Sequence, residues 1–207
     1  MSLIIVRHGR TEANASGLLL GRLDPALDDV GRAQAAAVGE VLGRGRGAEP
    51  PLPIARIVTS PLGRTRETAD AIAATTGAAV EVDDRWIELD YGEYDGRPQT
   101  DVPAEVWSNW RRDLSFAPPG GESLADLGAR VHGALDALAD QARTDHVVVV
   151  SHVSPIKAAV TWALGVGDEV VWRMFLSPAS ITRVSVAPHG GVLHCFNDVS
   201  HLAHVNV

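Results

Sequence analysis

The chain has little of several residue types and patterns that would place it in common classes of protein. Cys195 is its only cysteine, so no internal disulfide bond can form. No stretch approaches the roughly 18 to 20 consecutive apolar residues that a membrane-spanning helix needs. The first apolar run begins at Leu3, and no cationic or apolar leader precedes it. These observations predict a cytoplasmic protein without a membrane partner.

Positive charge is also scarce, and it is almost entirely arginine. Lys157 is the only lysine, and Asp and Glu outnumber Lys and Arg by 26 to 18, which gives a net charge of -8. A chain with this balance and without a Lys/Arg cluster is a poor partner for nucleic acid or an anionic membrane. We therefore expect neither partner. Any anionic substrate would have to be attracted by a local cluster of arginines.

Apolar runs alternate with amphipathic stretches along the 207 residues. This alternation predicts an α/β fold, a three-layer α/β/α sandwich with a mainly parallel, mixed central sheet. Residues 181–186 and 192–196 flank a Pro-His-Gly-Gly turn and predict a hairpin with antiparallel pairing at an edge of the sheet. The other strands are expected near residues 3–6, 56–59, 79–82 and 146–150, and the helices near 29–43, 62–76, 103–112, 123–142 and 154–164.

The length suits a single domain, 1–207, with a lid-like insertion at about residues 98–121. This insertion is richer in Trp and Pro than the rest. Trp107, Trp110 and Arg111 lie in it, and substrate contact is kept there as an alternative to packing. Trp172, outside it, is interpreted as a packing residue.

The first strand ends on an Arg-His-Gly triplet at residues 7–9. Ligands of open α/β sheets bind at the carboxyl ends of strands, so Arg7 and His8 lie where chemistry is usually done. A neutral imidazole can accept a phosphoryl group, and a guanidinium matches phosphate oxygens. Three further apolar runs lead to residues of the same chemistry: Arg64 after 57–58, Glu88 in the loop after 79–82, and His152 after 147–150. The pattern indicates phosphoryl transfer through a phosphohistidine.

From residue 3 to the end, the chain resembles the histidine phosphatase superfamily, also called phosphoglycerate mutase-like. The resemblance rests on the order and spacing of six segments: Arg7-His8-Gly9-x-Thr11-x-x-Asn14, Ser60-Pro61-x-x-Arg64-x-x-x-Thr68-Ala69, the loop from Glu88 to Gly96, Pro119-Gly120-Gly121-Glu122-Ser123, Val150-Ser151-His152, and Phe196-Asn197-Asp198-x-Ser200-His201.

The resemblance implies a role for each matching residue. His8 would be the phosphorylated nucleophile and Glu88 the proton donor. The phosphate pocket would be formed by Arg7, Arg64 and His152, with Thr11 and Asn14 as further phosphate contacts. Two positions depart from the family pattern: residue 10 is Arg instead of Glu or Gln, and Val153 replaces the glycine that commonly follows the second histidine. The Val153 backbone N–H is still expected to point at a phosphate oxygen.

Each of these roles has a structural alternative. Arg7 and Arg64 could pair with carboxylates, and His152 could be a hydrogen-bonded core histidine. Thr11 and Asn14 could cap a turn. Three other carboxylates share the loop of Glu88 and compete with it as the acid, namely Asp90, Glu93 and Asp95.

The function that these residues favour is metal-independent hydrolysis of a small phosphomonoester, without a cofactor. A cofactor-dependent phosphoglycerate mutase is the first alternative, although Asp90 stands where a mutase would want a cation. A non-catalytic domain that binds phosphorylated ligands is the second, although such relics usually lack the nucleophile or an arginine. A serine hydrolase is disfavoured because the G-x-S-x-G motif is absent. A homodimer is left open. His201 and His204 lack the neighbouring ligands that a metal site needs.

Overall fold

The computed structural model describes residues 1–45, 51–188 and 190–205, so that residues 46–50 and His189, which lies in the predicted turn, fall outside the described part. Six strands form one sheet in the order β3-β2-β4-β1-β5-β6. Strands β1 to β4 run parallel, whereas β5 is antiparallel to β1 and to β6. Their bounds are β1 Ser2–Arg7, β2 Ile54–Thr59, β3 Val80–Val82, β4 His146–Ser151, β5 Ile181–Ala187 and β6 Gly190–Asp198.

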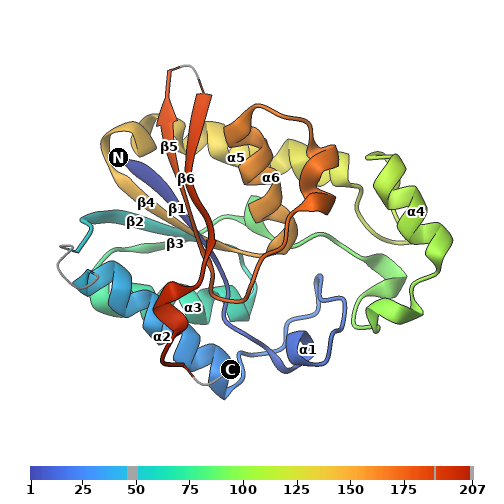
Figure 1. Ribbon diagram of the computed structural model, residues 1–207, viewed down its shortest axis with the longest axis horizontal. Helices are drawn as coiled ribbons and strands as arrows, with labels where there is room; N and C mark the ends of the chain where they lie inside the picture. Colours follow the sequence, from blue (N-terminus) through green and yellow to red (C-terminus); the bar gives the residue numbers. More distant parts are fainter. Residues whose placement is uncertain (46–50, 189, 206–207) are drawn as a thin grey trace.

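Helices cover both faces of this sheet (Figure 1). Helices α2 and α3 lie on one face and α5 and α6 on the other, while α4 stands apart beyond the sheet. The α-helices are α1 Glu12–Ala15, α2 Asp29–Arg44, α3 Gly63–Thr76, α4 Ala104–Arg112, α5 Leu124–Thr144 and α6 Val153–Leu164. Short 3-10 helices are η1 Asp84–Trp86, η2 Gly92–Tyr94, η3 Gln99–Asp101, η4 Asp168–Arg173 and η5 Ser200–Leu202. The predicted three-layer fold and its mixed sheet are confirmed.

Side chains of the buried strands point alternately to the two faces of the sheet, and this explains why helices pack on both faces. Leu3 and Ile5 of β1 pack into the core beneath α5 and α6, whereas Ile4 and Val6 pack toward α2 and α3. Successive side chains of a strand point to opposite faces, so an uninterrupted apolar run supplies both cores at once. The run at residues 3–6 therefore belongs in the middle of the sheet.

Helix α5 shows how local sequence sets an element. Its first turn is capped by Ser123, whose Oγ accepts the N–H of Asp126 at 3.1 Å. Apolar residues then recur at three- and four-residue spacing, which places them on one face of the helix. All five of them are buried against the sheet: Leu124, Leu127, Val131, Leu135 and Leu138.

The register of the parallel strands brings their carboxyl ends together. Arg7 of β1 lies beside Ser151 of β4, and Val150 of β4 lies beside Thr59 of β2. The chain leaves β1 through Gly9, where a Cβ atom would lie 2.3 Å from the carbonyl oxygen of Gly31 in α2. Only glycine allows α2 to approach the end of β1 so closely. The carboxyl ends of β1, β4 and β2 thus lie next to one another at one edge of the sheet.

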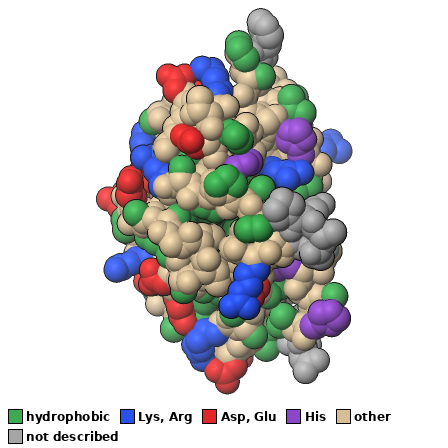
Figure 2. Space-filling view, turned by 90° about the vertical axis from the view of Figure 1, so that its left-hand side faces the viewer, with side chains coloured by type: hydrophobic (Ala, Val, Ile, Leu, Met, Phe, Trp, Pro, Cys, Tyr) green, Lys and Arg blue, Asp and Glu red, His purple; other side chains and the backbone are tan. Residues whose placement is uncertain are grey.

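The opposite side of the molecule, where the parallel strands begin, carries acidic and basic side chains interspersed with hydrophobic ones (Figure 2). Within the described ranges, no helix combines the length and the apolar character needed to cross a membrane.

Candidate active site

His8 follows β1 and is almost completely buried, with 3% of its surface exposed. Its Nδ1 lies 2.7 Å from the carbonyl oxygen of Gly9. Because a carbonyl oxygen only accepts, Nδ1 carries the proton and Nε2 keeps its lone pair. Burial lowers the pKa of His8 well below its usual value, and the positive charges of Arg64 and Arg7 lower it further. The structure thus presents a neutral imidazole whose Nε2 can act as a nucleophile.

Two arginines flank His8, and backbone carbonyl groups orient both of them. Arg7 Nη1 donates to the carbonyl oxygen of Leu176 at 2.6 Å. Arg64, in the first turn of α3, donates to the carbonyl oxygens of Leu23 at 2.7 Å and Gly21 at 2.8 Å. Burial lowers the pKa of Arg7 to about 10 and also lowers that of Arg64. Arg64 Nη1 also lies 3.4 Å from Asp24 Oδ1, so the alternative of pairing with a carboxylate is met in part for Arg64. Arg7 has only the carbonyl contact among the described residues, and the two guanidinium groups together place positive charge beside His8.

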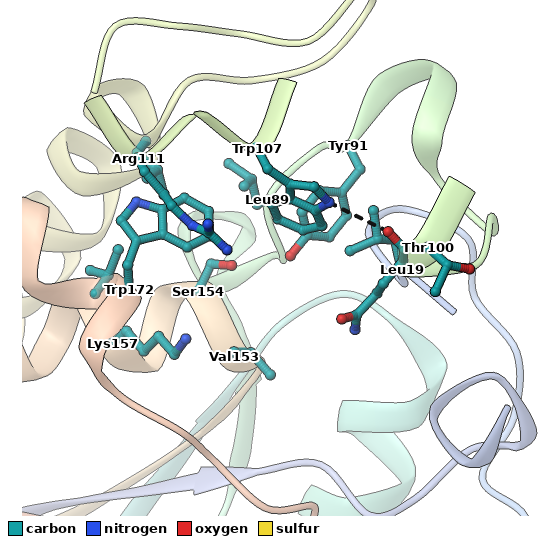
Figure 3. Close-up of a pocket in the computed structure, with 13 residues that line it drawn as sticks. Leu19, Leu89, Tyr91, Thr100, Trp107, Arg111, Val153, Ser154, Lys157 and Trp172 are labelled. Atoms are coloured by element: carbon teal, nitrogen blue, oxygen red, sulfur yellow. Dashed lines mark hydrogen bonds between the residues drawn. The ribbon is translucent and has the colours of Figure 1, made fainter. Parts of the chain in front are cut away.

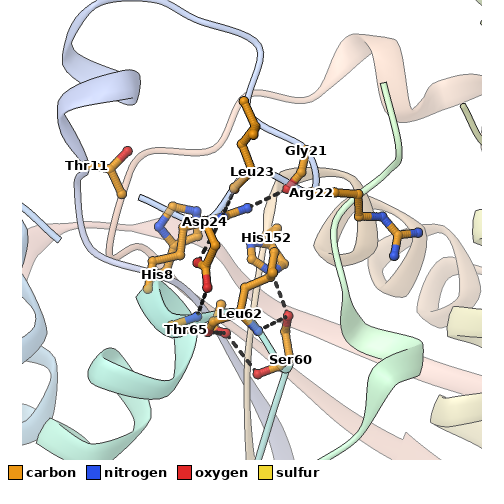
Figure 4. Close-up of polar contacts among 12 residues, drawn as sticks. His8, Thr11, Gly21, Arg22, Leu23, Asp24, Ser60, Leu62, Thr65 and His152 are labelled. Atoms are coloured by element: carbon orange, nitrogen blue, oxygen red, sulfur yellow. Dashed lines mark hydrogen bonds and ion pairs between the residues drawn. The ribbon is translucent and has the colours of Figure 1, made fainter. Parts of the chain in front are cut away.

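His152 follows β4 and is fully buried next to His8, with the two ring centroids 5.1 Å apart. Its Nε2 lies 2.8 Å from the Ser60 hydroxyl, which also accepts the N–H of Leu62 at 3.4 Å (Figure 4). The hydroxyl has one proton to donate, and we assign it to Nε2, which places the ring proton on Nδ1. Burial is the main cause that lowers the pKa of His152 well below its usual value. Ser60 was not singled out from the sequence, although it stands inside one of the motifs.

Three buried donors beside His8 have no hydrogen-bond partner among the described residues. They are Arg7 Nε, Arg64 Nε and His152 Nδ1. Buried polar groups are nearly always hydrogen-bonded, so unpaired donors that come from three neighbouring elements indicate a binding site for an anion. Their number and positive charge suit a tetrahedral oxyanion.

Glu88 lies in the loop after β3 and is 3% exposed. Its Oε1 accepts the backbone N–H groups of Leu89 at 2.7 Å and Ser154 at 3.1 Å, and its Oε2 accepts that of Val153 at 3.0 Å. The carboxyl group is therefore fixed at the N-terminus of α6. The Ser154 N–H also lies 3.4 Å from Oε2, so each carboxylate oxygen accepts from two backbone amides.

Glu88 is distinguished from the three carboxylates that competed with it in the sequence. Asp95 Oδ1 accepts the N–H of Gly21, and its Oδ2 accepts those of Arg22 and Leu23. Asp90 accepts the N–H of Gly92, and Glu93 is exposed. Of these four side chains, Glu88 lines the cavity at His8.

Thr11 and Asn14 form the cap of α1. The Thr11 hydroxyl accepts the N–H of Asn14 at 3.2 Å and donates to Asn14 Oδ1 at 3.0 Å, and the Thr11 N–H also donates to Oδ1. The structural alternative is thus present for both residues. Thr11 is fully buried, whereas Asn14 also lines the cavity at His8. A phosphate contact by either stays a prediction.

Val153 requires a correction. Its N–H was expected to point at a phosphate oxygen, but it donates to Glu88 Oε2. The physical reason is that Glu88 already occupies the N-terminus of α6, the position where an anion is most stabilised. The Val153 side chain lines the cavity instead.

The cavity at His8, which we call the catalytic cavity, has a volume of about 300 Å³. Arg7, His8 and Glu88 are among the residues that line it, and so is Phe175, with 74% of its surface exposed. Arg64 and His152 are completely buried next to His8 and do not belong to the lining. The structure thus brings together the five residues that the sequence placed at four strand ends.

A half-buried network holds the loop that carries Glu88. Arg130 of α5 donates to both carboxylate oxygens of Glu122, at 2.7 and 2.9 Å. The same guanidinium donates to the carbonyl oxygens of Arg85 at 2.6 Å and Ile87 at 2.7 Å. Arg130 was missed because nothing in the spacing of α5 sets it apart from other arginines on helices.

Within the described ranges, no group of three or more His, Cys, Asp or Glu is arranged to hold a metal ion.

Comparison with known proteins agrees with the geometry. The model of the histidine phosphatase superfamily (branch 1) matches residues 3–199. "Probable phosphoglycerate mutase GpmB" of Salmonella choleraesuis is 35% identical over 212 residues, which cover 98% of this chain and 95% of that protein. "Bifunctional protein Rv2228c" of Mycobacterium tuberculosis is 36% identical over 183 residues. That match covers 87% of this chain and 49% of the relative, so the chain spans about half the length of that protein.

A solved structure of a mycobacterial glucosyl-3-phosphoglycerate phosphatase, Rv2419c, with VO3 has the same fold, with a TM-score of 0.82. It is 30% identical to this chain, and the superposition covers 95% of this chain and 98% of that one.

Proposed function

The chain belongs to the histidine phosphatase superfamily, and from this premise we propose that it hydrolyses a small phosphomonoester through a phosphohistidine at His8. The observation that carries the proposal is the set of three unpaired donors around a neutral imidazole, Arg7 Nε, Arg64 Nε and His152 Nδ1. A phosphate monoester offers three non-bridging oxygens to these donors, and the reacting phosphorus is then held next to His8 Nε2.

In the first half-reaction, His8 Nε2 attacks phosphorus and the bond to the ester oxygen breaks. The Gly9 carbonyl oxygen, which accepts the N–H of Nδ1, stabilises the positive charge that develops on the ring. Arg7, Arg64 and His152 stabilise the charge of the equatorial oxygens. Glu88 gives a proton to the leaving oxygen, so the alcohol departs neutral.

In the second half-reaction, water attacks the phosphorus of the phosphohistidine. Glu88, now a carboxylate, takes a proton from this water, and the bond from phosphorus to Nε2 breaks, with its electron pair returning to the ring. Inorganic phosphate leaves and His8 is again neutral. No step requires a metal ion or a cofactor.

Two observations favour hydrolysis over a mutase reaction. A mutase must hold a doubly phosphorylated intermediate, which calls for several cations around the nucleophile. Among the described residues, Arg7 is the one Arg or Lys that lines the catalytic cavity, and Arg111 and Lys157 line a neighbouring cavity instead. Asp90, 3.9 Å from Arg22, adds a negative charge to the loop of Glu88. The solved relative named above is a phosphatase. The mutase remains the second candidate because one curated relative is named as such.

The proposal is tested by trapping the intermediate. A ³²P-labelled phosphomonoester is mixed with the protein and quenched, and we expect acid-labile, alkali-stable label on His8. His8→Ala should abolish both the label and phosphate release, whereas His194→Ala, at an exposed histidine of β6, should change neither. Inorganic phosphate should form with or without a chelator, and conversion of 3-phosphoglycerate to 2-phosphoglycerate should be negligible.

Other results would overturn parts of this proposal. Label on Ser60 or Cys195 would show that this residue, and not His8, is the nucleophile. A mutase rate above the hydrolytic rate, with 2,3-bisphosphoglycerate added, would favour the second candidate. Strong inhibition by a chelator would show that the reaction needs a metal ion.

A further inference from the structure

A second cavity adjoins the catalytic one under α4. It has a volume of about 460 Å³, and the two cavities share Tyr91, Gln99 and Val153 in their linings. A phosphomonoester bound at His8 would therefore direct its alcohol portion past these shared residues and into the second cavity. The proposed reaction assigns this cavity no role.

Two cations line the second cavity, Arg111 of α4 and Lys157 of α6. Figure 3 shows their side chains entering the space from opposite sides. Among the described residues, no carboxylate lies within 4.0 Å of either charged group. Lys157 is half-buried, and this burial lowers its pKa. The charge of Glu88 acts on Lys157 from a distance but does not contact it. A partly desolvated cation with no carboxylate in contact favours an anion in the ligand.

Aromatic rings form the wall between these cations. Trp107 and Trp172 both line the cavity, with centroids 6.1 Å apart and ring planes at 90°. The Arg111 guanidinium lies 5.9 Å from the centroid of the Trp107 ring. Such a wall binds an apolar or ring-shaped group because the ligand buries apolar surface and stacks on the rings. The rings by themselves do not select an anionic over a cationic ligand.

We propose that this second cavity recognises the alcohol portion of the substrate, and that this alcohol is a ring-containing or similarly bulky apolar group that carries a carboxylate. The inference rests on the proposed function. Lys157 and Arg111 bind the carboxylate, and Trp107 and Trp172 pack against the apolar portion. The volume is in the range that holds a drug-sized ligand, which is larger than a three-carbon acid.

Matched substrates test this inference. Benzyl phosphate and 4-carboxybenzyl phosphate share the same type of leaving oxygen and differ in one carboxylate. A charge-assisted contact predicts that kcat/KM is about tenfold higher for the carboxylated ester. 4-(Aminomethyl)benzyl phosphate, which carries a cation at the same end, should be the poorest of the three.

Substitutions at Lys157 test whether the cavity causes the preference for the carboxylated ester. Lys157→Met should reduce the ratio of kcat/KM between carboxylated and neutral ester to near one, and Lys157→Arg should retain most of it. Arg112→Met is the matched control, because Arg112 neighbours Arg111 and is equally exposed, but donates to Asn109 and does not line the cavity. An unchanged ratio in Lys157→Met, or an equal loss in Arg112→Met, would overturn the inference.

A binding measurement separates this inference from the proposed function. Since Lys157 is the only lysine, its acetylation by acetic anhydride can be followed by mass spectrometry in the His8→Ala protein. We expect 4-carboxybenzyl phosphate to slow this acetylation more than benzyl phosphate does at equal concentration. Protection without turnover in the wild-type protein would contradict the proposed function alone, whereas turnover without a carboxylate preference or protection would contradict this inference alone.

Discussion

At the scale of single residues, hydrogen-bond direction determines what each group can do. The Gly9 carbonyl fixes the proton of His8 on Nδ1, and the Ser60 hydroxyl leaves that of His152 on Nδ1 as well. The two neighbouring rings therefore have opposite functions. His8 offers a lone pair, and His152 offers a donor.

Glu88→Gln tests the role of the proton donor. We expect this substitution to lower kcat about 100-fold or more for an alkyl phosphate, whose alcohol needs a proton as it leaves. The loss should be much smaller for p-nitrophenyl phosphate, whose leaving group departs as a stable anion. Steady-state rates with both esters make the comparison, and Glu93→Gln, at an exposed position of the same loop, serves as the control.

An equal loss with both esters would reassign Glu88 to substrate binding. A loss in Glu93→Gln that depends on the ester would transfer the acid role to that residue.

At the scale of elements, loops rather than strands hold the remaining groups in place, and half-buried polar residues anchor these loops. Asp95 binds three successive amides at residues 21–23, and carbonyl oxygens of the same segment orient Arg64. Arg130 of α5 similarly holds the loop that ends at Glu88. The catalytic groups thus depend on contacts between segments far apart in sequence.

Arg130→Lys is expected to destabilise the protein by about 1.5 to 3 kcal/mol, because an ammonium group cannot replace the paired bonds to Glu122 and the bonds to the loop carbonyls. It should also lower kcat, since Glu88 loses its support. Urea unfolding and steady-state kinetics measure the two effects.

Arg143→Lys is the matched control, because its pair with Asp140 is exposed and contributes less than about 1 kcal/mol. An Arg130→Lys protein with the stability and kcat of the wild type would show that the network does not position Glu88.

At the scale of the whole molecule, folding buries two histidines among arginines, and this makes stability depend on pH. Burial is the largest cause that lowers the pKa of both His8 and His152, followed by the charge of Arg64. Each histidine is therefore neutral in the folded chain at pH values where the unfolded chain binds a proton. Their contribution is complete above the usual pKa of 6.5 and is lost as pH falls below it.

We therefore expect the free energy of unfolding to fall between about pH 6.5 and pH 5, with up to about 1.4 kcal/mol per pH unit from each histidine. Urea unfolding across this range measures the slope. The double variant His8→Gln/His152→Gln should have a shallower slope, whatever its absolute stability, whereas His194→Gln, which removes an exposed histidine, should keep the wild-type slope. Equal slopes in wild type and double variant would contradict the linkage.

The sequence by itself determined the order of elements and the place of the chemistry. Apolar runs of four residues, such as 3–6 and 147–150, can only be buried strands here, and the polar residues after them must emerge at one edge of a parallel sheet. This logic located His8, Arg64 and His152, and the five predicted helices agree with the structure to within about two residues at each end.

Only the tertiary structure decided which atoms face the substrate. The amide of Val153 binds Glu88, Thr11 uses its hydroxyl in a cap, and Ser60 and Arg130 orient groups that lie far from them in sequence. Sequence spacing could not show these contacts, because hydrogen bonds between side chains and distant backbone groups follow no local period. The periodicity of the sequence predicts on which face of a helix or strand a side chain lies. Packing between segments far apart in sequence determines which groups that side chain contacts.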